Sequence, residues 1–249
     1  MTIRAAVLIF FIPAVLHADA LGDIRAALTR MTGRQPIRGT YEVKVVRESK
    51  GRFANTNFRG GVAVELDSDT HGVRVTVPRN VLDQIAAEQK AQLANPKAQT
   101  PTLGSLDEVG PTDASEVLDM GPALLSMLDG AKLLSDGRGT WQGKPVRVVV
   151  LKLTPRPSAN GEIRMGKVTE SENRMTLWLA DDAVPLAAER TLSMKASFLI
   201  LRGEFKEKRS WHFARHGDRL VRVRYEASGT GSGMGQSGTE TKVALLRVH

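Results

Sequence analysis

Residues 39–45 read Gly-Thr-Tyr-Glu-Val-Lys-Val, so that apolar and polar side chains alternate along the stretch. Strict alternation is typical of a β-strand with one buried face, because successive side chains point to opposite sides. The same period of two recurs in residues 61–66 (Gly-Val-Ala-Val-Glu-Leu) and 73–77 (Val-Arg-Val-Thr-Val). Short connections join the three stretches, and they predict an antiparallel meander.

The second half of the chain repeats this pattern after a different central region. Turn residues such as His216-Gly217-Asp218 separate its apolar or alternating stretches. Strand patterns lie at residues 146–153, 175–180, 190–194, 198–205, 210–215, 220–225 and 242–248. A long run of strands joined by short turns predicts a mainly β (α+β) fold, with one strongly curved antiparallel sheet or an open β-barrel.

Residues 79–130 interrupt the strand patterns and predict a helical, proline-rich insertion. A helix is expected over 81–93, and a loop or lid over 95–112, where prolines and glycines gather. Residues 113–130 are more apolar, and Pro122 lacks the amide hydrogen that a continuous helix needs. We therefore expect two short helices there, and a further short helix at 23–31.

The first twenty residues have the order of a secretory signal peptide. Arg4 precedes the uncharged run 5–16, and small residues occupy the positions that signal peptidase reads, Ala18 and Ala20. A membrane-spanning helix needs about 20 apolar residues, so this shorter run favours cleavage near Ala20 over an anchor. A core helix is the alternative. We expect a soluble periplasmic or secreted protein, with residues 21–249 forming one domain and with peripheral membrane contact at most.

The composition excludes several classes of protein. The chain has 35 Lys and Arg against 27 Asp and Glu, a net charge of +8, and no cysteine. The positive charge is spread along the chain, which argues against a nucleic-acid partner but suits an anionic lipid headgroup, an acidic partner or simply a solvated surface. The lack of cysteine excludes disulfides, thiolate zinc sites and cysteine nucleophiles.

The sequence contains no catalytic or metal-binding motif that its context supports. His212 and His216 are four residues apart, but in a strand-and-turn pattern where they do not converge on a metal. Residues 233–238 match G-x-G-x-x-G, yet a strand pattern follows where a dinucleotide site needs a helix. We interpret residues 228–238 as a flexible hairpin loop. We expect no enzymatic activity, no metal and no cofactor.

The candidate binding residues are apolar. The helical segment carries Leu118, Leu124, Leu125, Met127 and Leu128, which could cover a curved sheet as a lid, since methionine adapts to irregular chains. The alternative is that this segment is a permanent part of the core.

Trp178 is the other candidate. It faces away from Met175, Leu177 and Leu179 on its own predicted strand. If both faces of this strand are buried, one of them could line a cavity; otherwise Trp178 belongs to a covered outer face.

The element order, a helix, three strands, a helical insertion and a long antiparallel run, resembles the periplasmic lipoprotein-carrier superfamily. This LolA/LolB-like fold includes RseB-type sensors. Residues 175–182 (Met-Thr-Leu-Trp-Leu-Ala-Asp-Asp), before Pro185-Leu186, resemble the late strand-turn-strand of the family. The longer proline-rich insertion and the glycine-rich last hairpin depart from it.

The resemblance implies an incomplete β-barrel that a helical lid closes over an apolar cavity for acyl chains. It implies a monomeric exported binding protein for a lipid or a lipidated protein, as in outer-membrane protein sorting. The alternative is an envelope interaction or stress-sensing module that binds an envelope protein and has no lipid cargo.

Overall fold

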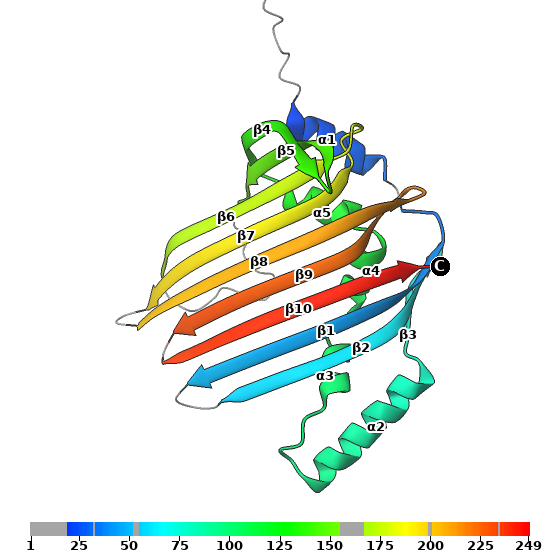
Figure 1. The fold of residues 1–249 in the computed structure, drawn as a ribbon, viewed down its shortest axis with the longest axis vertical. Helices are drawn as coiled ribbons and strands as arrows, with labels where there is room; N and C mark the ends of the chain where they lie inside the picture. The colour runs from blue at the N-terminus through cyan, green and yellow to red at the C-terminus, as the bar shows by residue number, and fades with distance from the viewer. Residues whose placement is uncertain (1–18, 32, 52–54, 155–166, 199–200, 234) are drawn as a thin grey trace, which may run out of the picture.

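A computed structural model describes residues 19–31, 33–51, 55–154, 167–198, 201–233 and 235–249. Ten strands form one antiparallel sheet in the order β3-β2-β1-β10-β9-β8-β7-β6-β5-β4 (Figure 1). The sheet is open, with β3 and β4 as its edges, so the predicted curved antiparallel sheet with helices is confirmed. The predicted signal peptide falls on residues 1–18, outside the described residues, and stays a prediction.

The strands are long and the helices short. The strands are β1 (Ile37–Gly51), β2 (Thr56–Asp69), β3 (Gly72–Thr76), β4 (Lys132–Trp141), β5 (Lys144–Lys152), β6 (Lys167–Leu179), β7 (Pro185–Phe198), β8 (Leu201–His216), β9 (Arg219–Gly233) and β10 (Gln236–Val248). The helices are α1 (Ala20–Thr29), α2 (Arg79–Ala94), α3 (Pro101–Leu106), α4 (Pro111–Leu118) and α5 (Gly121–Met127).

The pairing of β1 with β10 joins the first and last strands of the chain. Their register runs from Gly39 opposite Val248 to Gly51 opposite Gln236. The glycine-rich residues 228–238, predicted as a flexible loop, instead lie mostly within β9 and β10 and pair with each other. Glycine alternates with Ser and Thr in this part of β9, and this period of two suits a strand although glycine alone favours loops.

Helices α1, α3, α4 and α5 pack on one face of the sheet, here called the inner face; the opposite face is the outer face (Figure 1). The helical segment connects the two edge strands and crosses behind the sheet. The core between helices and sheet contains, among others, Tyr41, Val64, Leu151, Met175 and Leu177, all at most 1% exposed. In β1 and β2 the inward side chains are those that the alternating pattern predicts. The prediction of a half-buried strand over residues 73–77 is wrong: β3 is exposed along its length, with Val73 and Val75 each 37% exposed, because it is an edge strand.

The predicted loop over residues 95–112 contains a helix, α3. The Glu88 carboxylate, from α2, accepts hydrogen bonds from the backbone amide of Thr102 at 3.1 and 3.0 Å and from its hydroxyl at 2.6 Å. A carboxylate stabilises the amides that a helix N-terminus leaves unpaired. This contact between two helices explains why a stretch rich in Pro and Gly is ordered.

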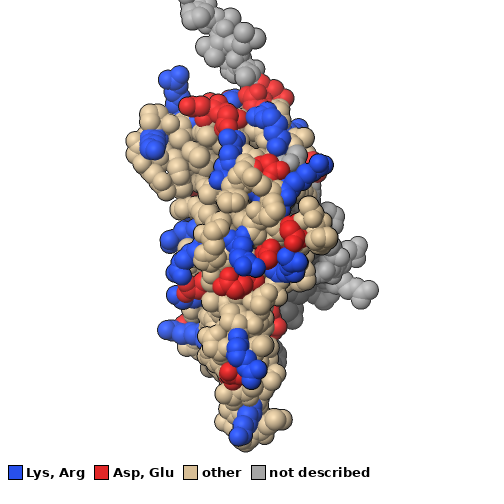
Figure 2. All heavy atoms as spheres, turned by 90° about the vertical axis from the view of Figure 1, so that its right-hand side faces the viewer, with Lys and Arg blue, Asp and Glu red and all other residues tan. Residues whose placement is uncertain are grey.

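Helix α2 extends away from the sheet and packs mainly against α3 (Figure 1). Within α2 only Val81 and Ile85 are buried, whereas Leu82 is 48% and Leu93 is 88% exposed. The helix leaves the edge of the sheet, so most of its apolar stripe has no surface to cover. On the side drawn in Figure 2, acidic and basic side chains are interspersed. Across the described ranges, no helix has the length and apolarity needed to span a membrane.

Candidate functional site on the inner face of the sheet

The predicted binding residues of the helical segment, four leucines and one methionine, differ in how deeply they are buried. Leu118, Leu124 and Leu128 are at most 1% exposed and belong to the main core. Leu125 and Met127 are partly buried and pack at its margin. In this structure the segment forms part of the core, which is the alternative that the sequence left open.

Trp178 lies on the outer face, away from those leucines. Its ring centroid is 5.3 Å from that of Trp141, and Trp141 meets His212 edge-on at 4.9 Å. Trp178, Ala187 and His212 are successive partners across β6, β7 and β8. Ala187 is only 1% exposed although it lies outside the main core, which fits a small residue beneath these rings. The structure therefore does not bring Trp178 together with the helical segment.

We expect His212 in this cluster to make stability depend on pH. Burial lowers the pKa of His212 below its ordinary value of 6.5, and the Arg224 guanidinium lowers it further, against a smaller opposite effect of Glu226. The unfolded chain therefore binds a proton more readily than the folded one, so stability falls as the pH drops below 6.5. We expect His212→Phe to flatten this dependence. Denaturant unfolding at pH 7.5 and 5.5 would test it; an unchanged slope in the variant would assign the dependence to other groups.

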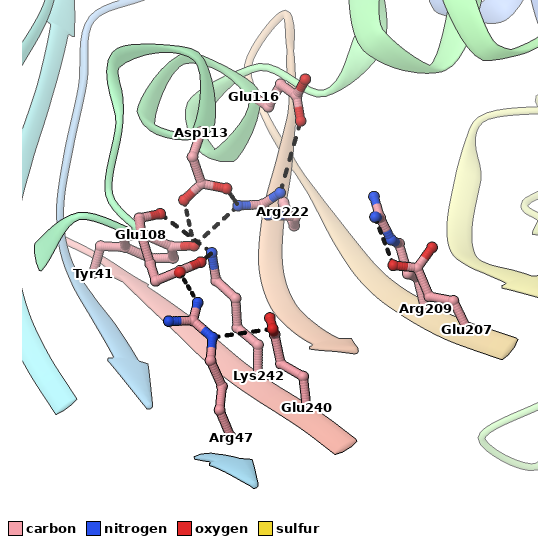
Figure 3. A network of polar contacts seen from close by, with 10 residues as sticks. All are labelled: Tyr41, Arg47, Glu108, Asp113, Glu116, Glu207, Arg209, Arg222, Glu240 and Lys242. Atoms are coloured by element: carbon pink, nitrogen blue, oxygen red, sulfur yellow. Dashed lines mark hydrogen bonds and ion pairs between the residues drawn. The ribbon is translucent and has the colours of Figure 1, made fainter. Parts of the chain in front are cut away.

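A belt of charged side chains crosses the middle of the inner face. Arg190, Arg209, Ala227 and Lys242 are successive partners across β7, β8, β9 and β10. The row ends at Met175 on one side and at Val45 on the other, and both are core residues. We define the charge belt as the cations Arg47, Arg190, Arg209, Arg222 and Lys242 with the acids Glu108, Asp113, Glu116, Glu207 and Glu240. Figure 3 shows all of them except Arg190.

One part of the charge belt holds α4 to the sheet. The Arg222 side chain is only 3% exposed and donates to Asp113 at 2.6 Å and to the Tyr41 hydroxyl at 3.0 Å. The Tyr41 hydroxyl in turn donates to Asp113 at 2.9 Å. Burial raises the pKa of Tyr41 far above its ordinary value, and it also raises the pKa of Glu116, which lies 3.9 Å from Arg222. These contacts are buried and link Arg222, Tyr41 and Asp113 to one another, which indicates a structural role, although the Nε of Arg222 has no partner among the described residues.

A second part holds the turn before α4. The Glu108 carboxylate pairs with Arg47 and, at 3.2 Å, with the Lys242 ammonium. Arg47 also donates to Glu240 at 3.0 Å. The rings of Phe58 and Tyr225 lie beneath the cations: Arg47 is 5.7 Å from the Phe58 centroid, and Lys242 is 6.0 Å from that of Tyr225. These cations already have carboxylate partners.

Arg190 and Arg209 differ from the other cations of the belt. They face each other directly in the β7–β8 register. Among the described residues Arg209 has one carboxylate hydrogen-bond partner, Glu207, which accepts from it at 2.7 Å, and Arg190 has none. Arg190 donates through Nε to the buried Asn173 at 2.8 Å. Burial lowers the pKa of Arg190, and the neighbouring Arg209 lowers it further. Like charges directly opposite each other destabilise a sheet, so this pair has no structural advantage.

An apolar strip lies next to this arginine pair, towards the ends of β7 and β8. It consists of Leu192, Met194 and Phe205, with the small residues Ala227, Gly229 and Gly231 beside them on β9. Leu192 and Met194 are partly exposed and Phe205 is 37% exposed. A methyl group added at Gly229 would have its nearest described neighbour, the Lys206 carbonyl oxygen, at an ordinary contact distance of 3.8 Å, so this position of β9 has room for a small side chain. These strand ends extend past α1, α4 and α5 (Figure 1).

Two shallow hollows, of about 360 and 440 Å³, lie on the outer face. Charged and hydroxyl side chains dominate their lining, for example Glu48, Lys50, Glu204, Lys206 and Thr230 around the first. Such a lining suits water better than an acyl chain. Within the described ranges, His, Asp and Glu side chains form no group of three that could hold a metal ion. The inner face therefore combines two features that the sequence did not reveal. Arg190 and Arg209 face each other with only one hydrogen-bonded carboxylate among the described residues, Glu207, and a partly exposed apolar strip lies beside them.

Comparisons with known proteins identify one weakly similar solved structure. No protein-family model and no curated protein matches the chain. Among solved structures, the crystal structure of MucB in complex with MucA(peri) is similar at 13% sequence identity, over 91% of this chain and 94% of that chain, with a TM-score of 0.23. We base no conclusion on a similarity at this level. The resemblance to the lipoprotein-carrier superfamily stays a prediction.

Proposed function

We propose that this protein is an exported binding protein that holds a lipid, or the acyl chains of a lipoprotein, on the inner face of its curved sheet. The observation that carries the proposal is the apolar strip of Leu192, Met194 and Phe205, which is partly exposed beside Gly229 and Gly231, two positions of β9 that carry no side chain. The signal-peptide pattern of residues 1–20 supports export to the periplasm or beyond.

The energetics favour a chain of moderate length on this strip. Each buried CH₂ group contributes about 0.8 kcal/mol, so an acyl chain gains most by lying along several partly exposed apolar side chains at once. The segment from Leu118 to Leu128 is already packed in the core. We therefore place the chain on the strip beyond the charge belt, and not beneath this segment.

Adding a side chain at Gly229 on β9, beside the apolar strip, tests the proposal. We expect Gly229→Val to lower the affinity for a fluorescent acyl probe about tenfold, because excluding two CH₂ groups from contact loses ~0.8 kcal/mol each. Strand residues tolerate Val well, so the variant should fold. The matched control is Gly137→Val on β4, where an added methyl group meets nothing within 4 Å. If neither the wild-type protein nor the control binds acyl probes or extract lipids by native mass spectrometry, the proposal fails.

The second candidate is an envelope interaction or sensing module without lipid cargo. It is favoured by α2, which leaves the sheet after the short edge strand β3 and has Leu82 and Leu93 exposed. Under this proposal α2 contacts an envelope protein. Site-specific cross-linking from position 93 in cells would capture one defined partner, whereas a position on the outer face such as Lys195 would not; equal cross-linking from both positions would count against it.

A further inference from the structure

We propose that the facing Arg190 and Arg209 on the inner face form a site for the anionic headgroup, a phosphate or a carboxylate, of a lipid whose chain lies on the apolar strip. The inference rests on the proposed function and adds to it the chemical class of the cargo. The arginines come from β7 and β8, adjacent strands of the sheet.

The first argument is electrostatic. Directly opposed side chains in an antiparallel pair have Cβ atoms about 4.5–5.5 Å apart, so the two guanidinium groups repel each other in the empty protein. Glu207, whose side chain is 15% exposed, supplies one negative charge for two positive ones. A bound anion would remove the imbalance, and its effect would be strong because these groups are half removed from water.

The second argument concerns hydrogen bonds that the protein leaves unmade. Among the described residues Arg190 makes one hydrogen bond, through Nε to Asn173 at 2.8 Å, and its terminal amino groups have no acceptor there. The Nε of Arg209 is buried without a partner, and so is the Nε of Arg222, whose side chain is 3% exposed. Guanidinium groups bind phosphate and carboxylate through paired N–H donors, which these arginines can supply.

The surrounding groups leave the site positive. Lys242 lies in the same row of the sheet, and Tyr225 and Glu116 lie within electrostatic range of Arg209. Glu116 also faces Arg222, which offsets its charge. Burial raises the pKa of Tyr225, so its hydroxyl keeps its proton and remains a donor.

The position of the pair selects a lipid over a free anion. Leu192 follows Arg190 by two residues on the inner side of β7, and Leu192 faces Glu207 across the strands. Residues two apart on a strand are separated by about 6.6 Å, so a headgroup on the arginines places the first methylene groups of its chain at the strip. Inorganic phosphate would bind the two arginines but would make no contact with the apolar strip.

The test compares three probes by isothermal titration calorimetry: dodecyl phosphate, 1-dodecanol and inorganic phosphate. We expect the protein to bind dodecyl phosphate more tightly than either of the others. Arg190→Gln and Arg209→Gln should each weaken dodecyl phosphate about tenfold or more and leave 1-dodecanol unchanged, as the loss of a charged hydrogen bond predicts. The control Arg174→Gln removes an exposed arginine from the outer side of the neighbouring strand β6 and should have no effect.

A second measurement separates a binding role from a structural one. Because the pair is repulsive when empty, Arg190→Gln should raise the melting temperature of the ligand-free protein, whereas loss of a structural residue would lower it. Equal affinity for dodecyl phosphate and 1-dodecanol overturns the headgroup site and leaves the proposed function standing. Absence of binding to both overturns the proposed function. Tight binding of inorganic phosphate alone would overturn the lipid assignment.

Discussion

Asp113→Ala is expected to destabilise the protein by about 3 kcal/mol, because it leaves a buried guanidinium without its closest carboxylate. The Asp113 carboxylate accepts from Arg222 at 2.6 Å and from the Tyr41 hydroxyl at 2.9 Å. Arg222 is 3% exposed and cannot turn to water without disturbing the core. The loss would also free α4 from the sheet. Urea unfolding followed by circular dichroism gives the free energy of unfolding directly.

Two further variants make this result specific. Glu240→Ala removes an acid that is 50% exposed and pairs with Arg47, and exposed pairs contribute about 0.2–1 kcal/mol. Replacing the whole buried group, Tyr41→Phe with Asp113→Ala and Arg222→Met, removes all the unsatisfied partners together and should be less harmful than Asp113→Ala alone. Equal costs for Asp113→Ala and Glu240→Ala would contradict the view that Arg222 depends on a buried partner.

The strands could be predicted because their signal is local. Tyr41, Val43 and Val45 alternate with polar residues, and the structure buries all three on one face. The pairing of β1 with β10 could not be predicted in the same way. It joins residues about two hundred positions apart in the chain, and alternation along a strand says which face is buried without saying which strand lies beside it.

The candidate site could not be predicted from the sequence for a related reason. Arg190, Arg209 and Lys242 occupy inward positions of strands whose other inward residues include Ala188, Trp211 and Ala244. Charges at such positions are the signal that sequence reading could have used, since strands with one buried face normally place charges outward. That the three charges share one row follows only from the register of four strands. The formation of α3 could not be predicted either, because Glu88, which binds the amides at its N-terminus, lies on another helix.

Leu124→Ala should lower the free energy of unfolding by about 2–5 kcal/mol, the usual cost of deleting a buried leucine side chain. Leu124 is 1% exposed within the core, whereas the neighbouring Leu125 on the same helix is only partly buried, so Leu125→Ala should cost clearly less. The two substitutions distinguish a core role of this segment from a lid role. If the segment is a lid that opens, neither leucine belongs to the part of the protein that unfolds cooperatively. Thermal and denaturant unfolding of both variants, without ligand, supplies the measurement. If both substitutions lower the free energy of unfolding by a similar small amount, the segment is a lid. The acyl chain would then bind beneath α5, in the space that the core side chains fill in this structure.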